Sequence, residues 1–253
     1  MIYDPLAQIL VADVETTGFS SRSDEILSLA IVDGHGKVVF DELFKPEHKT
    51  SWLEAARVNG ITPNMVKNAP KFADHKKRLR AIFSGKTVLF YNSSFDERFL
   101  TDELENAADI FCVMNAFTEY YREPNSKRGG KWVHKKLEFA MNHFKLRFKG
   151  DPHTAKADAL AALDVFLKLA EVGRENIKKA WGNGLDKRGK ADYVILDTLA
   201  YVNLSKGNVI GVIKNQHLDD CIKLIKADYP DHSKVLLCRK PSDCVIQPIY
   251  VND

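Results

Sequence analysis

Two carboxylates at the end of an apolar run are the first residues of this sequence with an evident chemical use. Asp13 and Glu15 follow the run at 9–12. Such a run, closed by Gly18, predicts a short buried strand. Because side chains alternate along a strand, both acids leave the same face, while Val14 points to the other. Charges beside a hydrophobic interior need a partner, and a divalent cation is suited to them; the alternative is an edge strand whose acids face water.

A third acid, Asp158, lies on a helix predicted over 154–171. Its face of the helix is otherwise apolar and is formed by Ala162, Val165 and Leu169. An acid on such a stripe needs a cation or a firm hydrogen bond. A capping role is the alternative for this residue.

His153 and Asp96 are two further candidates on separate elements. His153 precedes Asp158 by five residues, where an imidazole could serve as a general base near neutral pH; a structural or exposed histidine is the alternative. Asp96 lies in the first turn of a helix that follows a strand predicted at 87–91. Acids there offset the helix dipole, yet strand ends are also where α/β sites lie, so the residue alone leaves both readings open.

Four carboxylates and a histidine suit one reaction class. Two divalent ions about 3.5–4 Å apart activate water and stabilise the leaving oxygen of a phosphodiester. Magnesium prefers oxygen ligands, which favours acids over cysteines. No Walker-type loop, Gly-x-Ser-x-Gly elbow or His-Glu-x-x-His pair offers a competing chemistry.

The elements expected around these residues form a mixed α/β sheet covered by helices. A meander of three strands followed by strand–helix alternation favours this fold class. Strands are predicted at 9–12, 25–33, 38–44, 87–91 and 110–114. Helices are predicted at 51–58 (capped by Ser51 and ended by Gly60), from Pro63, at 69–84, from about 96 to 106, and at 115–122, 133–144 and 154–171.

Three segments are expected: a catalytic domain at 1–172, a basic linker at 173–191, and a small α+β domain of unknown role at 192–253. The last is predicted to hold a hairpin of 193–204 with 209–214, a helix at 217–227, and strands at 235–238 and 244–250. Its composition carries no functional signal.

The composition is that of an ordinary globular protein. The chain has 253 residues, of which 45% are hydrophobic and 28% charged, and a net charge of +3. This mildly basic balance is compatible with a polyanionic partner without requiring one. The four cysteines form no C-x-x-C pair, which predicts reduced thiols rather than a zinc or redox motif. The N-terminus does not read as a signal peptide and no stretch reads as a membrane span, so a cytoplasmic protein is expected.

These residues resemble the DnaQ-like 3′-to-5′ exonucleases, in the branch named for four acids and a histidine. Three motifs carry the resemblance, in the family's order and spacing, over about residues 7 to 171. They are Asp-x-Glu-Thr-Thr-Gly at Asp13–Gly18, Asn-x-x-Phe-Asp at Asn92, Phe95 and Asp96, and His-x-Ala-x-x-Asp at His153, Ala155 and Asp158. The segment Asn59-Gly60-Ile61-Thr62 is also similar to the family's Gly-Ile-Thr segment.

The resemblance implies a ribonuclease-H-like fold with a five-stranded sheet and a 3′-to-5′ exonuclease that releases nucleoside monophosphates. Two Mg²⁺ or Mn²⁺ ions would be held by the four acids, and His153 would accept a proton from the attacking water. The residues implied to hold metal are Asp13, Glu15, Asp96 and Asp158. Those implied to contact substrate are Thr16, Thr17, Gly18, Phe19, Asn92 and Phe95.

The partners implied are single-stranded or frayed 3′ ends of DNA or RNA, and a DNA polymerase if the chain is a proofreading subunit. The alternative is a catalytically inactive module on the same fold that binds nucleic acid or a polymerase. The loop at 127–132 mixes basic and aromatic residues and could follow a single strand, or be a solvated loop. The sequence leaves the choice between DNA and RNA and the oligomeric state open.

Overall fold

The structure is a computed structural model. It describes residues 5–125 and 132–181, and beyond them the strands at 193–196, 201–203, 209–211, 234–238 and 244–248. The chain divides into two compact units, one spanning Ala7–Phe166 and the other consisting mainly of Leu167–Asp253. All the candidate catalytic residues belong to the first unit.

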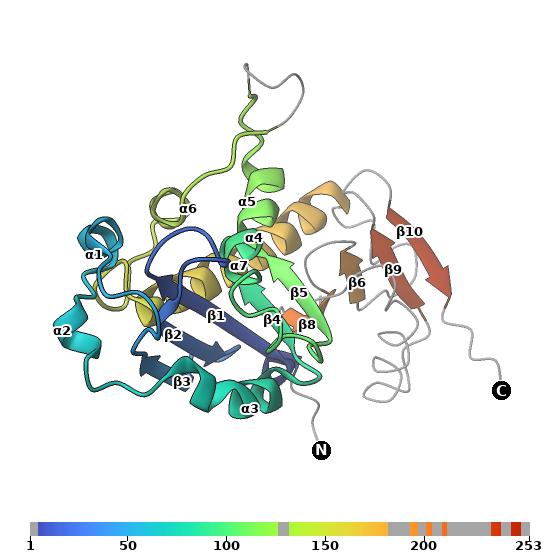
Figure 1. Cartoon of the computed structure of the whole chain (residues 1–253). Coiled ribbons are helices and arrows are strands. Elements are labelled where there is room, and N and C mark those ends of the chain that lie inside the picture. The colour runs from blue at the N-terminus through green and yellow to red at the C-terminus, as the bar shows by residue number, and fades with distance from the viewer. Residues whose placement is uncertain are drawn as a thin grey trace. The chain divides into compact units, whose positions relative to one another are not determined.

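The first unit is built on a five-stranded sheet of order β3-β2-β1-β4-β5 (Figure 1). The strands are β1 (Ile9–Thr16), β2 (Ile26–Asp33), β3 (Val38–Leu43), β4 (Thr87–Phe90) and β5 (Asp109–Cys112). The first three pair antiparallel, whereas β4 is parallel to β1 and β5 is parallel to β4. This arrangement confirms the predicted mixed sheet that opens with a meander.

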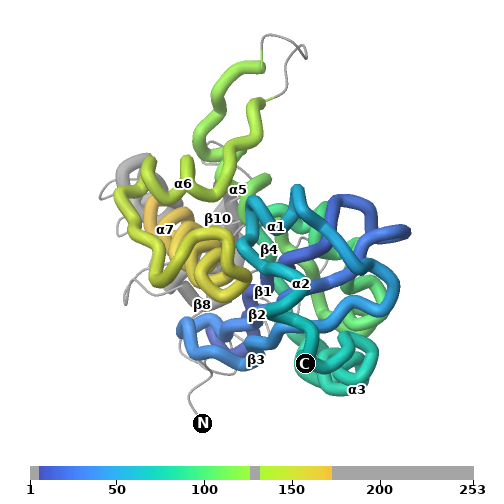
Figure 2. The backbone as a smooth tube through the Cα atoms, turned by 60° about the vertical axis from the view of Figure 1, so that its left-hand side comes forward, coloured from blue at the N-terminus to red at the C-terminus, as the bar shows by residue number. Residues whose placement is uncertain are grey.

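Two helices cover opposite faces of this sheet: α3 (Phe72–Phe83) and α7 (Ala155–Trp181) (Figure 2). Alternation along β1 decides which residues face each helix. Leu10, Ala12 and Val14 belong to a core cluster with residues of α3. The intervening residues face α7, so the strand sends apolar side chains to α3 and its two acids to the other side.

The remaining helices are short. They are α1 (Leu53–Asn59), α2 (Pro63–Val66), α4 (Ser93–Asp96), α5 (Val113–Tyr121) and α6 (Leu137–His143). Gly60 ends α1 in the left-handed conformation, with φ of 70°, as predicted. The predicted cap at Ser51 is wrong, because Trp52 occupies the N-cap position and no side chain caps the helix. Trp52 is buried and donates its indole N–H to the carbonyl of Ile61, so tertiary packing sets the start of α1.

The helix predicted from about 96 to 106 is also wrong. Only α4 is helical, and turns follow it. The amide of Leu100 bonds the carbonyl of Glu97, three residues back, in place of a helical ladder. Leu100 and Leu104 are nevertheless buried in the sheet core, so their helical spacing reflects packing without a continuous helix.

The second unit contains a sheet of order β10-β9-β6-β7-β8. Its strands are β6 (Tyr193–Leu196), β7 (Tyr201–Asn203), β8 (Val209–Gly211), β9 (Lys234–Cys238) and β10 (Cys244–Pro248). The predicted strand at 193–204 is two paired strands, and β7 pairs with β8 as the hairpin expected. The helix predicted at 217–227 and the loop at 127–131 lie outside the described residues.

Helix α7 extends further than expected. It was predicted to end at residue 171, but it continues to Trp181, into the segment predicted as a linker. The domain boundaries at 172 and 191 remain predictions. Within the described part of the chain, no helix combines the length and the apolar character that crossing a membrane would require.

Candidate active site

Asp13 and Glu15 lie on the part of β1 that has β2 on one side and no paired strand on the other. On one side, Asp13 lies opposite Ala30 and Glu15 opposite Ser28 of β2. On the other side, the pairing with β4 ends at Val11. The acids therefore lie beyond the end of β4, next to backbone groups of β1 that no parallel neighbour engages.

Asp158 joins these two acids from the first turn of α7. One carboxylate oxygen from each of Asp13, Glu15 and Asp158 lies within 4.8 Å of the others. The apolar residues that share the face of Asp158 are buried, which brings this turn of the helix against the sheet. The peptide N–H of His153 donates to Asp158 Oδ1 at 3.3 Å and fixes its orientation.

Asp96, the last residue of α4, lies behind this cluster rather than in it. Its side chain is 4% exposed, and Oδ1 accepts a hydrogen bond from the amide of Val14 at 3.3 Å. That amide belongs to the stretch of β1 beyond the end of β4. Asp96 thus takes the place of the missing strand neighbour, and its charge still acts on Asp13.

The acids raise one another's pKa. Burial first, and then the charges of Asp96, Glu15 and Asp158, raise the pKa of Asp13 well above its ordinary value. Burial and the charge of Asp158 raise the pKa of Glu15 to about 8, and burial raises the pKa of Asp96 to about 8. Burial also raises the pKa of Asp158. Grouped carboxylates of this kind are unfavourable as bare anions.

This arrangement fits divalent cations. The donor set is made of carboxylate oxygens that converge from β1 and α7, with a further acid on α4, and hard cations prefer such ligands. Positive charge at the centre would relieve both the burial cost and the mutual repulsion. No residue of the described chain outside this group forms a comparable cluster of three metal-ligating side chains.

His153 stands at the rim of the cluster. Its side chain is 48% exposed, and its Nε2 lies 3.5 Å from Glu138 Oε1. Its backbone is left-handed, with φ of 64°, a conformation that is uncommon for residues other than glycine. The peptide N–H thus orients Asp158 while the imidazole remains open to solvent.

The loop after β1 holds the residues predicted to contact substrate. Thr16 Oγ1 donates to the carbonyl of Gly18 at 2.6 Å. Thr17 Oγ1 donates to Asp24 Oδ1 and accepts the amide of Glu25. Phe19 projects from the loop and is 85% exposed. The threonines therefore shape the loop, and the aromatic ring is its accessible part.

Phe95 and Asn92 belong to α4 and to its N-terminal boundary. The ring of Phe95 contacts that of Phe19 edge-on, with centroids 6.3 Å apart, and packs against Phe99. Asn92 is the N-cap of α4, but its Oδ1 accepts the hydroxyl of Ser94. Phe95 is thus brought to the predicted substrate loop, whereas the side chain of Asn92 stays within its own turn.

Asn59 is a site residue to which sequence reasoning gave no role, because Asn59-Gly60 was interpreted as the end of a helix and as part of a segment similar to the family. Its side chain is buried, donates to the carbonyl of Thr16 at 3.2 Å and accepts the amide of Ile61. A hydrogen bond from Asn59 also lowers the pKa of Glu15 against the effect of burial. The buried amide ties the end of α1 to the acidic strand.

Asp24 and Glu25 were also missed. Asp24 accepts from Thr17 and from the amide of Ser20, and pairs with Lys49 at 3.0 Å. Glu25 accepts the amides of residues 47–49. These two acids connect the loop between β1 and β2, here called the substrate loop (residues 17–25), to the segment after β3. Their position in the polar stretch before β2 is the only sequence signal for them.

Gly18 lies close to the carboxylate of Asp24, which makes a Gly18→Ala substitution informative. An added Cβ would lie 2.6 Å from the carboxylate of Asp24, which is fixed by Lys49 and Thr17. We expect Gly18→Ala to raise KM for a single strand roughly tenfold, since a displaced loop misplaces the groups that position the substrate. Steady-state kinetics test this, with Gly85→Ala as a control for a strained glycine replacement outside the site, since its φ of 70° disfavours alanine although no atom lies within 4 Å. An unchanged KM would contradict the role of the loop.

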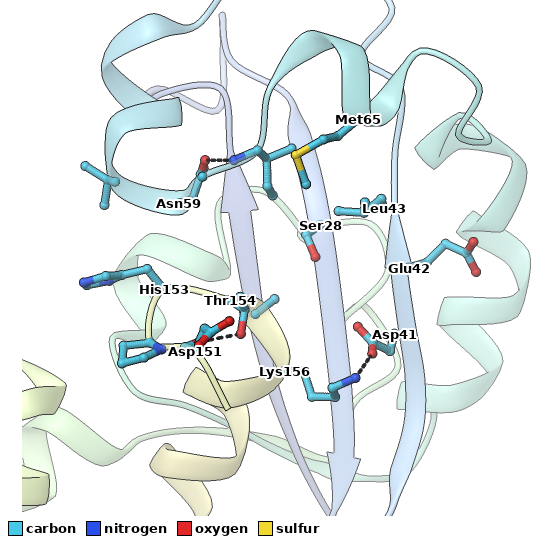
Figure 3. A pocket seen from close by; sticks show the side chains of 15 residues that line it. Ser28, Asp41, Glu42, Leu43, Asn59, Met65, Asp151, His153, Thr154 and Lys156 are labelled. Atoms are coloured by element: carbon cyan, nitrogen blue, oxygen red, sulfur yellow. Dashed lines mark hydrogen bonds and ion pairs between the residues drawn. The ribbon is translucent and has the colours of Figure 1, made fainter. Parts of the chain in front are cut away.

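A pocket of about 690 Å³ opens beside His153 and Asn59 (Figure 3). Strands β2 and β3 form its floor, the α1–α2 connection one wall and the start of α7 the other. An ion pair of 2.6 Å between Lys156 and Asp41 lies at one end. Its size is within the usual range for pockets that take small molecules.

Comparisons with known proteins agree with this geometry. The model of a family described as exonuclease matches residues 10–166. The exonuclease CP81 of Escherichia phage 186 is 31% identical over 173 residues, covering 64% of this chain and 87% of that protein. The PolC-type DNA polymerase III of Latilactobacillus sakei is 31% identical over 186 residues, covering 72% of this chain but only 12% of the polymerase.

Solved structures share the fold at lower identity. Exonuclease I of E. coli, in complex with a dA16 oligonucleotide, has a TM-score of 0.53 and 18% identity over 65% of this chain and 40% of its own. A full-length 3′-exonuclease has a TM-score of 0.51 and 18% identity, covering 65% of this chain and 82% of its own. The predicted ribonuclease-H-like fold and the resemblance to DnaQ-like exonucleases are thereby confirmed.

Proposed function

Because this chain belongs to the RNase T family of exonucleases, we propose that it hydrolyses the 3′-terminal phosphodiester bond of a nucleic acid strand and releases nucleoside monophosphates. The observation that carries this proposal is the convergence of Asp13, Glu15 and Asp158 to within 4.8 Å from β1 and α7. Such a cluster has little structural use, since its burial and repulsion are unfavourable.

The family implies divalent metal cofactors, and in this chain Asp13, Glu15, Asp96 and Asp158 would hold two Mg²⁺ or Mn²⁺ ions. When bound, such ions stabilise the charge that develops on the phosphate and leaving oxygens and make a water molecule easier to deprotonate. Asp96 can contribute while its Oδ1 accepts the amide of Val14, because a carboxylate has further lone pairs. The proximity of the four negative charges supports this ligand set.

His153 is the proposed general base. It accepts a proton from water as the water oxygen bonds to phosphorus, while the bond from phosphorus to the 3′ oxygen of the penultimate nucleotide breaks. That oxygen takes a proton from solvent water, and the terminal nucleotide leaves as its 5′-monophosphate. The exposed imidazole supports this assignment, because it is accessible to solvent and its Nε2 lies 3.5 Å from Glu138 Oε1.

The substrate loop and its aromatic partner are proposed to hold the end of the strand. Thr16, Thr17, Gly18 and Phe19 form one side and Phe95 the other, with Asn92 in the adjoining turn. An exposed ring beside the acids offers a stacking surface for a base. The pocket beside His153 is large enough to receive the terminal nucleotide.

We propose single-stranded or frayed DNA as the substrate and RNA as the competing possibility. The PolC-type relatives and the exonuclease I complex with dA16 support DNA, and the former also support association with a polymerase. Because this chain spans 12% of the PolC-type protein, a proofreading role is a proposal for which co-purification with a polymerase is the test. The cytoplasmic location also remains a prediction.

Mononucleotide release from a 3′-labelled strand with Mg²⁺ tests the function. We expect the wild type to release labelled monophosphate at once and a 5′ label only when the strand is consumed. Asp13→Ala should reduce release at least about 100-fold, and Glu105→Gln, an exposed acid outside the site, should not. Equal and negligible release from wild type and Asp13→Ala would instead favour the inactive binding module. Matched DNA and RNA strands in competition identify the sugar preferred.

A further inference from the structure

We infer that a second, smaller pocket of about 200 Å³ binds a backbone phosphate of the strand upstream of the scissile bond, through Lys45 and Arg98. This inference rests on the proposed function. The pocket lies behind the substrate loop, between the segment after β3, the start of α3 and the turn after α4. We call it the Lys45–Arg98 pocket. Its residues are Ser21, Asp24, Glu25, Ile26, Lys45, Pro46, Glu47, Phe72, Ala73, Lys76, Arg98 and Phe99.

The acids of this pocket are already engaged. Asp24 pairs with Lys49, and Glu25 accepts three backbone amides. Hydrogen bonds from Ser20 and Lys49 hold the pKa of Asp24 below its ordinary value even though burial opposes them. Glu47 pairs with Lys71 at 3.1 Å. Each of these carboxylates is therefore already held by a cation or by backbone amides, and none of them pairs with Lys45 or Arg98.

One of the three cations is engaged as well. Lys76 lies 3.3 Å from Asp102 and 3.7 Å from Glu103. Glu103 is almost fully buried, and its Oε1 has no hydrogen-bond partner, so it depends on the charge of Lys76. Lys76 is thus committed to a buried acid.

Lys45 and Arg98 are the cations that remain. Both are exposed, and neither forms an ion pair with any residue in the described part of the chain. The main chain at Lys45 is fixed by its hydrogen bond to the carbonyl of Pro70. Two unshared positive charges therefore line one hollow, which favours an anion there.

The pocket is connected to the active site through aromatic rings. The guanidinium of Arg98 lies 5.8 Å from the centroid of Phe95, which contacts Phe19 edge-on. Phe95 also directly precedes Asp96 in the chain. A strand whose last bases lie along these rings would have its backbone beside Arg98, because stacking platforms and cationic grooves follow a single strand together.

The size and openness of the pocket favour a tethered phosphate over a free one. Its volume of about 200 Å³ is below the usual range of pockets that enclose small molecules. Exposed cations bind a free anion weakly in salt. A phosphate held nearby by the rest of the strand has a much higher effective concentration. A phosphodiester is thus the occupant that fits.

Salt dependence and strand length test this inference. The variants are Lys45→Ala, Arg98→Ala and the double variant, with Lys77→Ala as a matched loss of an exposed cation from α3 outside the pocket. We expect the double variant to lower kcat/KM on a ten-nucleotide strand roughly tenfold, and the fall of log kcat/KM with log salt to be shallower by about 0.7. A dinucleotide is too short to reach the pocket, so on this substrate the kcat/KM of the double variant should be closer to that of the wild type.

A methylphosphonate scan locates the contact. The kcat/KM of the wild type should fall when one particular upstream linkage is made uncharged. The kcat/KM of the double variant should not change when that linkage is replaced. Equal salt slopes and equal length dependence in wild type and double variant, with both well folded by circular dichroism, would overturn the inference. Competition by inorganic phosphate that depends on Lys45 and Arg98 would also overturn it, because it would assign a free anion to the pocket. Failure of the proposed function is distinct, since no strand of any length would then release a mononucleotide.

Discussion

Replacing Asp13 with asparagine is expected to raise the melting temperature of the metal-free protein at pH 8 while abolishing mononucleotide release. The carboxylate of Asp13 is half-buried beside Asp96, Glu15 and Asp158, and its pKa is raised accordingly. Removing one charge relieves this repulsion. A gain on the order of 1–3 kcal/mol corresponds to about 2–4 °C for each kcal/mol in a protein of this size. Thermal unfolding in the presence of a chelator measures it.

The raised pKa values of these acids also make the stability of the metal-free protein depend on pH. The pKa of Glu15 and of Asp96 is about 8, against ordinary values of 4.5 and 3.8. The folded state therefore keeps protons that the unfolded chain releases above about pH 4, so the stability of the metal-free protein falls as the pH rises to about 8. Asp13→Asn should flatten this fall, and saturating Mg²⁺ or Mn²⁺ should offset it.

Glu105→Gln is the matched control, because it removes an exposed acid and should leave the melting temperature unchanged. A melting temperature that rises from pH 5 to pH 8 without metal would argue against the buried cluster. So would an Asp13→Asn variant that is less stable than wild type in the presence of a chelator.

His153→Asn is expected to lower kcat about 100-fold or more while leaving metal affinity within a few-fold of wild type. Asparagine is preferable to alanine here, because it tolerates the left-handed backbone at this position. The substitution keeps the peptide N–H that orients Asp158 and removes only the imidazole. Single-turnover kinetics and Mn²⁺ titration measure the two effects separately.

Glu138→Gln serves as the companion variant, since it removes the carboxylate 3.5 Å from His153 Nε2 without touching the acids. We expect a smaller loss of kcat than for His153→Asn, because this substitution leaves the imidazole itself in place. Loss of metal binding in His153→Asn, or an unchanged kcat, would refute the role of His153 as base.

Sequence periodicity was sufficient to predict the direction of a side chain wherever regular strand or helix geometry sets that direction. Alternation along β1 predicted that Asp13 and Glu15 share a face, and their carboxylates do lie together. The apolar stripe of α7 likewise predicted that Asp158 points inward. Both rest on regular geometry that local sequence specifies.

Contacts between distant segments could not be predicted in this way. The hydrogen bond from Val14 to Asp96 depends on where β4 ends, which no local pattern states. Asn59 has a glycine after it, which explains the helix end but not its bond to Thr16. The turns at 97–106 have the spacing of a helix, and only the packing of Leu100 and Leu104 against the core distinguishes them. Tertiary context overrides local preference at such places.

The early end of β4 offers a spectroscopic handle on the catalytic centre. The amide proton of Val14 is directed at Asp96 because no strand is there to receive it. The nuclear magnetic resonance frequency of this single amide proton should therefore change when the carboxylate of Asp96 ionises or binds metal. A backbone group can in this way serve as an internal gauge of metal occupancy.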